Sequence, residues 1–115
     1  MFKSKLLLLI LPIIILFGCR KSDIEPDVPA CIKNKIVDFK KPQALCDDAM
    51  VSEFEFKGKI VYVFYQGSCG ADMTDDVIDA GCNYLGYLGG LTGNTTINGV
   101  DFYANATYLR IVWEK

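Results

Sequence analysis

The 115-residue sequence contains no histidine. Histidine titrates nearest to neutral pH and is the commonest metal ligand, so its absence removes the usual general base and the usual metal site. Ser68 stands between Gly67 and Cys69, but the nucleophile pattern Gly-Xaa-Ser-Xaa-Gly is not met and no imidazole can activate the hydroxyl. We therefore expect a protein that is not an enzyme and that uses no cofactor.

Closely spaced cysteines and basic clusters are also missing. None of the five cysteines lies in a Cys-Xaa-Xaa-Cys pair, the spacing typical of zinc sites and redox-active dithiols, so we expect no metal site among them. The 14 acidic residues outnumber the 12 basic residues, and the basic residues form no cluster. Such a chain is not expected to bind nucleic acid.

A long apolar run occurs at the N-terminus, over residues 6–17, and only Pro12 interrupts it. Lys3 and Lys5 precede it and form a positively charged region. The run is too short to span a bilayer as a helix, and it fits the hydrophobic region of a secretory signal peptide. We predict that residues 1–18 are a lipoprotein signal peptide.

The apolar run ends in Leu16-Phe17-Gly18-Cys19, which resembles a bacterial lipobox. In that motif the cysteine sulfur receives a diacylglycerol, so the resemblance implies acylation of Cys19, with palmitate among the chains, and a membrane-lipid partner. Lys21 in place of an aspartate resembles lipoproteins that leave the inner membrane. We expect an envelope protein anchored in the outer membrane, facing the periplasm or the cell surface. The alternative is an ordinary signal peptide or single anchor with Cys19 incidental.

A polar segment with two prolines, Pro26 and Pro29, follows the lipobox. Prolines favour extended chain, so residues 19–29 are predicted to be the lipidated cysteine and a flexible tether without regular structure. Residues 30–115 remain for one small domain, and a core of that size needs covalent support.

A helix is predicted over residues 30–40. Ile32, Ile36 and Phe39 recur at helical spacing, and polar residues fill the opposite face. Pro42 prevents the helix from continuing. We expect this N-terminal helix to pack on a sheet rather than on a partner.

The sheet is organised around residues 60–65, a run of strand-forming apolar residues that predicts a central strand buried on both faces. In residues 51–56, Glu53 and Glu55 are expected to face solvent, while Phe54 and Phe56 face the core. Further strands are predicted at residues 74–79, 83–88 and 107–113, and Asn98-Gly99 signals a hairpin tip. The expected fold is α+β: one helix on an antiparallel sheet of about five strands, tied by disulfides.

In the last strand, Leu109, Ile111 and Trp113 are expected on one face, with Tyr108, Arg110 and Val112 on the other. Gly86, in the middle of the fourth predicted strand, suggests a bulge or a close backbone approach.

Export would place the cysteines in an oxidising compartment where thiols pair. Lipidation uses Cys19, so four cysteines remain, and three pairings are possible. We favour Cys31–Cys46 and Cys69–Cys82, because pairing neighbours closes short loops without crossing the sheet. Each bridge is expected to add about 3 kcal/mol to stability.

Several motifs together resemble a known family. They are Phe56 to Val63, Gly67-Ser68-Cys69-Gly70-Ala71-Asp72-Met73, Asp79-Ala80-Gly81-Cys82-Asn83 and the closing Ile111-Val112-Trp113. This order is similar to that of uncharacterised small lipoproteins from Bacteroidota that carry a domain of unknown function. The resemblance covers about residues 30–115, and it implies a compartment and a fold but no activity.

Four aspartates lie within eight residues: Asp72, Asp75, Asp76 and Asp79. Calcium takes six to eight oxygen ligands, and such a cluster could supply some of them. The order of an EF-hand is missing, and we favour the alternative of a solvated loop followed by a turn aspartate.

The expected function is that of a membrane-anchored envelope lipoprotein whose domain is a non-catalytic binding or accessory module. Its partner is a protein, a peptide or a glycan. A shallow aromatic patch of Tyr62, Tyr65, Tyr84 and Tyr87 would favour glycan or peptide binding.

The alternative is an inhibitor of an incoming enzyme such as a lysozyme or a protease. An exposed, rigid loop at residues 67–72 or 89–94 would favour that alternative.

Overall fold

The structure is a computed structural model that describes residues 23–42 and 45–115. The predicted signal peptide, residues 1–18, and the predicted acylation site, Cys19, lie outside the described residues. Within those two described ranges, no helix is long and apolar enough to cross a membrane.

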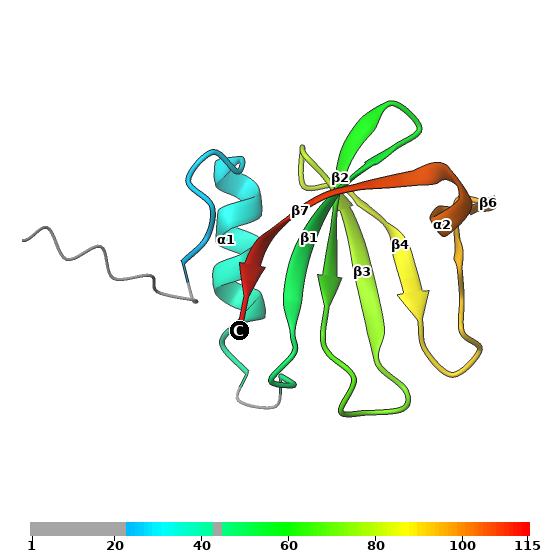
Figure 1. The fold of residues 1–115 in the computed structure, drawn as a ribbon, viewed down its shortest axis with the longest axis horizontal. Helices are drawn as coiled ribbons and strands as arrows, with labels where there is room; N and C mark the ends of the chain where they lie inside the picture. Colours follow the sequence, from blue (N-terminus) through cyan, green and yellow to red (C-terminus); the bar gives the residue numbers. More distant parts are fainter. Residues whose placement is uncertain (1–22, 43–44) are drawn as a thin grey trace, which may run out of the picture.

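The chain forms an α+β fold, as predicted (Figure 1). Five strands make an antiparallel sheet in the order β4-β3-β2-β1-β7, and β5 pairs with β6 in a small second sheet. The elements are α1 (Ala30–Phe39), β1 (Met50–Phe56), β2 (Lys59–Tyr65), β3 (Thr74–Asp79), β4 (Tyr84–Gly89), β5 (Thr96–Ile97), β6 (Val100–Asp101), α2 (Phe102–Asn105) and β7 (Ala106–Glu114).

The middle strand of the sheet is β2, and both of its faces are covered. Val61, Tyr62, Val63 and Phe64 are four consecutive buried residues. Tyr62 and Phe64 belong to the core cluster under α1, while Val61 and Val63 belong to a second cluster on the other face. The prediction of a central, two-sided strand is therefore confirmed.

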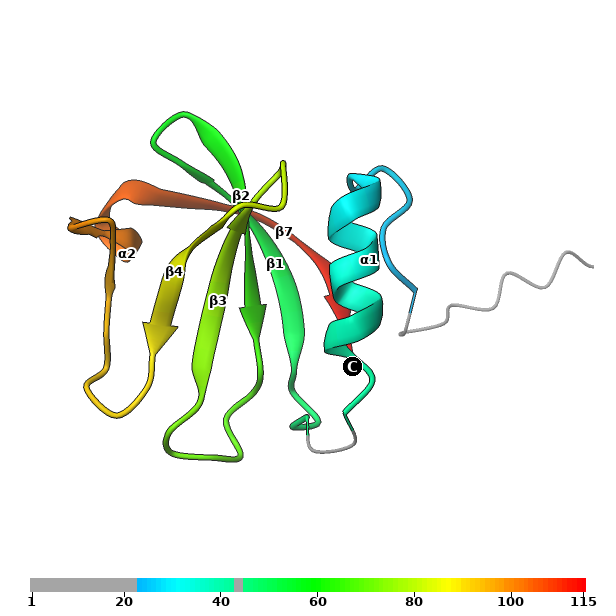
Figure 2. The ribbon, with the colours of Figure 1, turned by 180° about the vertical axis from the view of Figure 1, so that it is seen from behind.

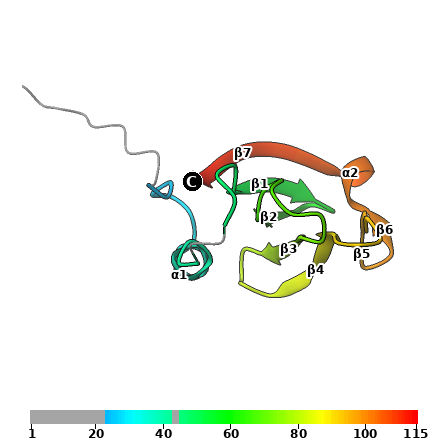
Figure 3. The same cartoon turned by 90° about the horizontal axis from the view of Figure 1, so that it is seen from below.

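Helix α1 lies on one face of the sheet, and α2 with β6 lies at the opposite side (Figures 1 and 3). Ile32 and Ile36 are fully buried, as their helical spacing predicted, and Phe39 at the last position packs edge-on against Phe64 and Trp113. The helix ends one residue earlier than predicted, before Lys40.

The second face of the sheet is covered by the β5–β6 hairpin and by α2. Asn98 and Gly99 form the hairpin tip with positive φ angles of 51° and 76°, which confirms the turn prediction. Helix α2 was not predicted; Asp101 begins it, and its carboxylate accepts a hydrogen bond from the Ala104 amide at 2.8 Å. The next residue, Phe102, is fully buried.

Strand β7 departs from the predicted alternation because it carries two irregularities opposite β1. Val51 faces Trp113 and Ser52 faces Ile111, so Val112 is an extra residue at the first irregularity. Val112 and Trp113 are consequently both buried in the cluster under α1, although they were expected on opposite faces.

Glu53 is buried, and the prediction that it faces solvent is wrong. It lies on the α1 face opposite Tyr62 and Arg110. The Tyr62 hydroxyl donates to Glu53 at 3.0 Å, and the Arg110 guanidinium forms an ion pair with Glu53 at 3.2 Å. Burial and this hydrogen bond raise the pKa of Tyr62 to about 12. Glu55 is exposed, as predicted, and Phe56 and Trp113 are buried.

The domain end of the predicted tether is packed on the sheet. Val28 is buried in the cluster under α1, and the Glu25 amide donates to the Val112 carbonyl at 3.0 Å. Asp27 forms an ion pair with Arg110 at 2.9 Å, which holds the pKa of that carboxyl below its usual value. The chain therefore leaves the domain along the β7 edge.

The four cysteines of the domain form two disulfides, but the favoured pairing is wrong. The bridges are Cys31–Cys82, with Cα atoms 6.2 Å apart, and Cys46–Cys69, with Cα atoms 5.5 Å apart. Cys82 sits in the turn between β3 and β4, which lies beside the start of α1. The first bridge thus ties the helix to the sheet, and the second joins the segment before β1 to the loop after β2.

Candidate functional site

One half of the α1 face of the sheet is not covered by the helix. Two cross-strand rows run over this face, one through Phe64, Asp76 and Tyr87 and the other through Tyr62, Ile78 and Tyr84. Phe64 and Tyr62 lie buried under α1, whereas Tyr84 is 61% exposed and Tyr87 is 42% exposed. The open half therefore lies over β3 and β4, which Figure 2 shows beyond the helix.

Tyr84 and Tyr87 share this face because β4 is irregular. Residues three apart in a regular strand point to opposite faces. Here Val77 faces Gly86 while Ile78 faces Tyr84, so one residue of β4 has no partner. Gly86 adopts a φ of +149°, and a Cβ there would lie 3.1 Å from Ile97 of β5. Gly86 therefore accounts for both features that the sequence suggested: the bulge in β4 and the close approach to β5.

Between α1 and the open half of the sheet lies a groove made of two adjoining hollows of about 330 and 340 Å³. Both hollows are lined by Phe39, Phe64 and Asp76, so they form one continuous feature. The remaining lining residues are Lys35, Asp38, Pro42, Leu45, Gln66, Met73, Thr74 and Ile78. The groove has an apolar floor and a polar rim, which is the usual character of a binding site.

Asp76 is the charged group on the floor of this groove. Burial raises its pKa above the ordinary value, and the positive charge of Lys35 opposes that effect. Burial, together with the charge of Asp76, also raises the pKa of Tyr84. The groove therefore places a partly desolvated carboxylate beside two exposed tyrosines.

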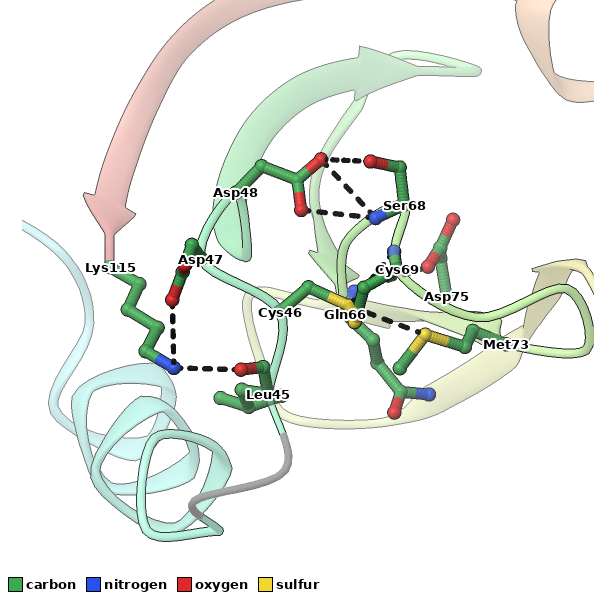
Figure 4. The surroundings of a disulfide bond; sticks show 10 residues. All are labelled: Leu45, Cys46, Asp47, Asp48, Gln66, Ser68, Cys69, Met73, Asp75 and Lys115. Carbon is green, nitrogen blue, oxygen red and sulfur yellow. Dashed lines mark hydrogen bonds and ion pairs between the residues drawn. A yellow bond between two sulfur atoms is a disulfide. The ribbon is translucent and has the colours of Figure 1, made fainter.

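The end of the groove is bounded by the loop of residues 66–73, which the Cys46–Cys69 disulfide holds in place (Figure 4). Gly67 has a φ of +111°, and a Cβ there would lie only 2.1 Å from the Cβ of Cys46. Only glycine can occupy this position, because any side chain would meet the disulfide. Met73, which lines the groove, has its sulfur 3.6 Å from the sulfur of Cys46.

Ser68 and Asp48 tie the same loop to the segment before β1 (Figure 4). The Ser68 amide donates to Asp48 at 3.0 Å, and the Ser68 hydroxyl donates at 2.6 Å. These bonds lower the pKa of Asp48. The Ser68 hydroxyl thus has a structural partner that fixes the loop against the segment before β1.

The loop of residues 89–94 lies at the same end of the sheet (Figure 1). Gly89 and Asn94 exchange backbone hydrogen bonds of 2.8 and 3.0 Å that close the loop at its base. The Gly90 amide donates to the Met73 carbonyl at 3.0 Å and thereby joins the two loops. Leu91 at the tip is 85% exposed.

The profile of a family described as Domain of unknown function (DUF6970) matches residues 38–115. The chain belongs to this family. The predicted membership in a family with a domain of unknown function is thereby confirmed. Comparison with curated proteins and with solved structures gave no match.

The DUF6970 segment includes all strands of the sheet and Phe39, but it begins after most of α1. The Cys46–Cys69 disulfide lies within the segment, whereas Cys31–Cys82 joins it to a residue that precedes it. The groove accordingly combines a floor from the DUF6970 segment with a wall that includes Lys35 from outside it.

The four clustered aspartates, considered above as possible calcium ligands, do not converge. Asp75 and Asp76 are neighbours in β3 and point to opposite faces. Asp79 is occupied in the β3–β4 turn, where it accepts from the Gly81 amide at 3.0 Å and from the Asn83 amide at 2.8 Å. Within residues 23–42 and 45–115, no group of three acidic or cysteine side chains could hold a metal ion.

The predicted aromatic patch is present only in part. Tyr62 is 2% exposed and forms the hydrogen bond to Glu53 described above. Tyr65 follows Phe64 in β2 and points to the opposite face of the sheet. Tyr84 and Tyr87 remain, and the alternation of strand residues alone would have separated them. The groove itself was not predicted, although Phe39 and Phe64 were both recognised as core-forming residues.

Proposed function

We propose that this protein is a lipid-anchored envelope lipoprotein of Bacteroidota and that it serves as a non-catalytic binding module. The observation that carries the binding role is the open half of the α1 face, where a groove floored by Phe39 and Phe64 adjoins the exposed Tyr84 and Tyr87. Tyrosines exposed beside an apolar groove supply contact area together with a polar group, a combination typical of recognition surfaces.

The position of the tether supports an anchored binding module. The lipobox-like Leu16-Phe17-Gly18-Cys19 precedes a segment that lies along β7, where the Glu25 amide donates to Val112. Strand β4 is at the opposite edge of the sheet. Four strand spacings of about 4.8 Å separate the two edges by about 19 Å. An anchor at Cys19 would leave the groove accessible to a partner.

Site-specific photo-crosslinking tests the binding role in living cells. The full chain carries p-benzoylphenylalanine in place of Tyr84 in one strain and in place of Tyr103 in the other. Tyr103 is a matched control because it is equally exposed, at 62%, but lies on α2. We expect light-dependent adducts from position 84 and not from position 103. Adducts from position 103 alone, or equal adducts from both positions, would contradict the groove as binding face.

Metabolic labelling tests the anchor. Cells expressing the wild type or Cys19→Ser are fed a clickable palmitate, and the membrane fraction is analysed. We expect label on the wild type, and we expect the variant to be unlabelled and either unprocessed or released from the membrane. Equal labelling of the two proteins would show that Cys19 is not the acylated residue.

An inhibitor of an incoming enzyme is the second candidate, and the pair of joined loops at one end of the sheet favours it. A disulfide ties the loop of residues 66–73 to the segment before β1, and backbone hydrogen bonds close the loop of residues 89–94 at its base. The exposed Leu91 is an apolar side chain suited to another protein's pocket. Assays against a lysozyme and an apolar-specific protease test this role. Inhibition that Leu91→Asp abolishes and Tyr84→Ala preserves would favour the inhibitor over the groove-binding module.

A further inference from the structure

Asp76 differs from the other carboxylates of the domain in that it lines a groove and has no bonding partner. Among the described residues, it accepts no hydrogen bond and forms no ion pair, although it lines both hollows. Carboxylates of the domain that do have such partners are those of Asp27, Asp38, Asp47, Asp48, Glu53, Asp75, Asp79 and Asp101.

The side chains around Asp76 are aromatic. Phe64 and Tyr87 are its direct cross-strand neighbours, one on each side, and Tyr84 lies in the next row of the same face. The faces of aromatic rings attract cations, most strongly where water is partly excluded. A carboxylate between such rings therefore forms a combined electrostatic and aromatic subsite for one positive charge.

The charge balance of the surroundings also favours a cation. All 14 acidic residues lie within residues 23–115, whereas Lys3, Lys5, Arg20 and Lys21 precede this range and leave eight of the 12 basic residues in it. On the groove itself, Asp38 of α1 is paired with Lys41 at 3.0 Å, and the positive charge of Lys35 acts on Asp76 without forming an ion pair, so the carboxylate of Asp76 has no direct partner among the described residues. The domain thus attracts basic partners at long range and presents them with one unpaired carboxylate.

We propose that Asp76, Tyr84 and Tyr87 form a subsite for a lysine or arginine side chain of a partner peptide or protein. The neighbouring residues of that partner lie in the groove against Phe39 and Phe64. This inference rests on the proposed function, since it takes the groove as the binding face. A neutral glycan would stack on the tyrosines but would leave the unpaired carboxylate of Asp76 without a partner of opposite charge, so a basic peptide fits the observations better.

The experiment uses the full lipidated chain in micelles of a non-ionic detergent and measures binding by calorimetry. The probes are an eight-residue peptide of alternating lysine and glycine, its counterpart with glutamine in place of lysine, and a neutral oligomer of N-acetylglucosamine. We expect the lysine peptide to bind, the two neutral probes not to bind, and added salt to weaken the affinity.

Four variants locate the subsite. Asp76→Asn is expected to weaken binding of the lysine peptide about tenfold, because a charge-assisted contact is lost. Tyr84→Ala and Tyr87→Ala are each expected to weaken it by a few-fold, in keeping with the loss of one cation–π contact. Asp72→Asn is the matched control, since Asp72 is an exposed carboxylate on the loop of residues 66–73, and it should leave the affinity unchanged. Matching melting curves of the four variants confirm that they are folded.

Four results would overturn the inference. Equal losses of affinity in Asp72→Asn and Asp76→Asn would mean that the lysine peptide responds only to the net negative charge of the domain. Equal binding of the glutamine peptide would remove the role of charge. Binding of the N-acetylglucosamine oligomer that survives Asp76→Asn would assign the tyrosines to a glycan. Crosslinks from position 84 in cells, together with no binding of the lysine peptide, would contradict this inference but would still support the groove as the binding face.

Discussion

The two faces of the sheet are covered by elements of different kinds, and only one of them is left half open. On the α2 face, Phe102 fills the centre, and its ring lies 5.2 Å from that of Phe54 and 5.1 Å from that of Phe56. On the α1 face, Phe39 packs against Phe64 and Trp113, and the sheet beyond them is exposed. The difference shows that a single straight helix and a folded-back chain do not cover a sheet equally.

Geometry explains the difference. An α-helix with its side chains is about 10 Å wide, which is about two strand spacings, whereas a sheet of five strands is about twice as wide. Helix α1 therefore covers the side of β7, β1 and β2 and Ile78 of β3, and it leaves Asp76 of β3 and the two tyrosines of β4 open. The chain after β4 instead returns over the other face as β5, β6 and α2, and it follows the curvature of the sheet.

Removing each disulfide should have the largest effect on stability and tests how firmly α1 is held on its face of the sheet. Replacing Cys31 and Cys82 by serine should cost about 4 kcal/mol, because this bridge closes a loop of 51 residues and holds α1 on the sheet. Replacing Cys46 and Cys69 should cost about 3 kcal/mol, since that loop spans 23 residues. Urea unfolding of both variants measures the two losses. A larger loss from the second pair would show that the loop of residues 66–73, rather than the position of α1, limits stability.

The two central aromatic residues test whether each face has its own core. Phe102→Ala and Trp113→Ala should each lower the free energy of unfolding by about 3 kcal/mol, because each removes a ring that is almost completely buried. Their effects should add in the double variant, since the residues belong to separate clusters on opposite faces. Denaturant titration of the three variants checks this, and a loss below 1 kcal/mol for either residue would contradict its role in the core.

The ion pair between Glu53 and Arg110 is a polar contact on the α1 face and contributes to stability. Glu53→Ala should cost about 2 kcal/mol, because it leaves the buried Tyr62 hydroxyl without its acceptor and removes one of the two carboxylates paired with the partly solvated Arg110. Glu55→Ala is the control on the same strand and should change stability by less than about 0.5 kcal/mol, because Glu55 is exposed. Thermal unfolding of the two variants under identical conditions gives the comparison, and equal effects would place Glu53 in solvent.

The pH dependence of Asp75→Asn should be the smallest effect, and it reports on the face opposite the groove. Burial raises the pKa of Asp75 to about 6, and the hydrogen bond from the Gln66 amide opposes this shift only in part. Because the folded pKa is raised, the folded carboxyl is still uncharged at pH 4, where the unfolded carboxyl, with its ordinary pKa of 3.8, is only beginning to favour ionisation. Its ionisation then destabilises the fold progressively as the pH rises from about 4 to about 6.

We therefore expect Asp75→Asn to match the wild type at pH 4 and to exceed its stability by about 1 kcal/mol at pH 8, a figure reduced for the remaining solvation of the carboxyl. Unfolding free energies at the two pH values measure the effect. A variant that is stabilised equally at pH 4 and pH 8 would show that the charge of Asp75 is not responsible.

Local patterns predicted most of the sheet correctly. The uninterrupted apolar run of residues 60–65 identified β2, and Asn98-Gly99 identified the tip of the β5–β6 hairpin. The pairing Cys46–Cys69 was also within reach, because Met50 faces Tyr65 and the two cysteines lie equally far beyond that pair. Pairing residues 51–56 with residues 60–65 would therefore have favoured the Cys46–Cys69 bridge. We instead favoured the pairings that close the shortest loops.

Other features had no local signal. Glu53 reads as a solvent-facing residue because it alternates with Phe54, and only the arrival of Arg110 and Tyr62 from neighbouring strands makes its burial possible. Helix α2 has four residues, too few to show a helical period, and its one signal was the capping residue Asp101. The irregularities of β7 and β4 depend on pairing with another strand and cannot be read from either strand alone.

The sequence by itself thus determined the fold class, the strands of the sheet, the first helix and the presence of paired cysteines, because each follows from residues close together in the chain. Tertiary structure alone decided that α1 is tied to the β3–β4 turn through Cys82 and that the helix covers one half of its face. It also brought Tyr84, Tyr87 and Asp76 together beside Phe39. Those outcomes depend on contacts between residues tens of positions apart, whose geometry no local pattern of polarity or spacing encodes.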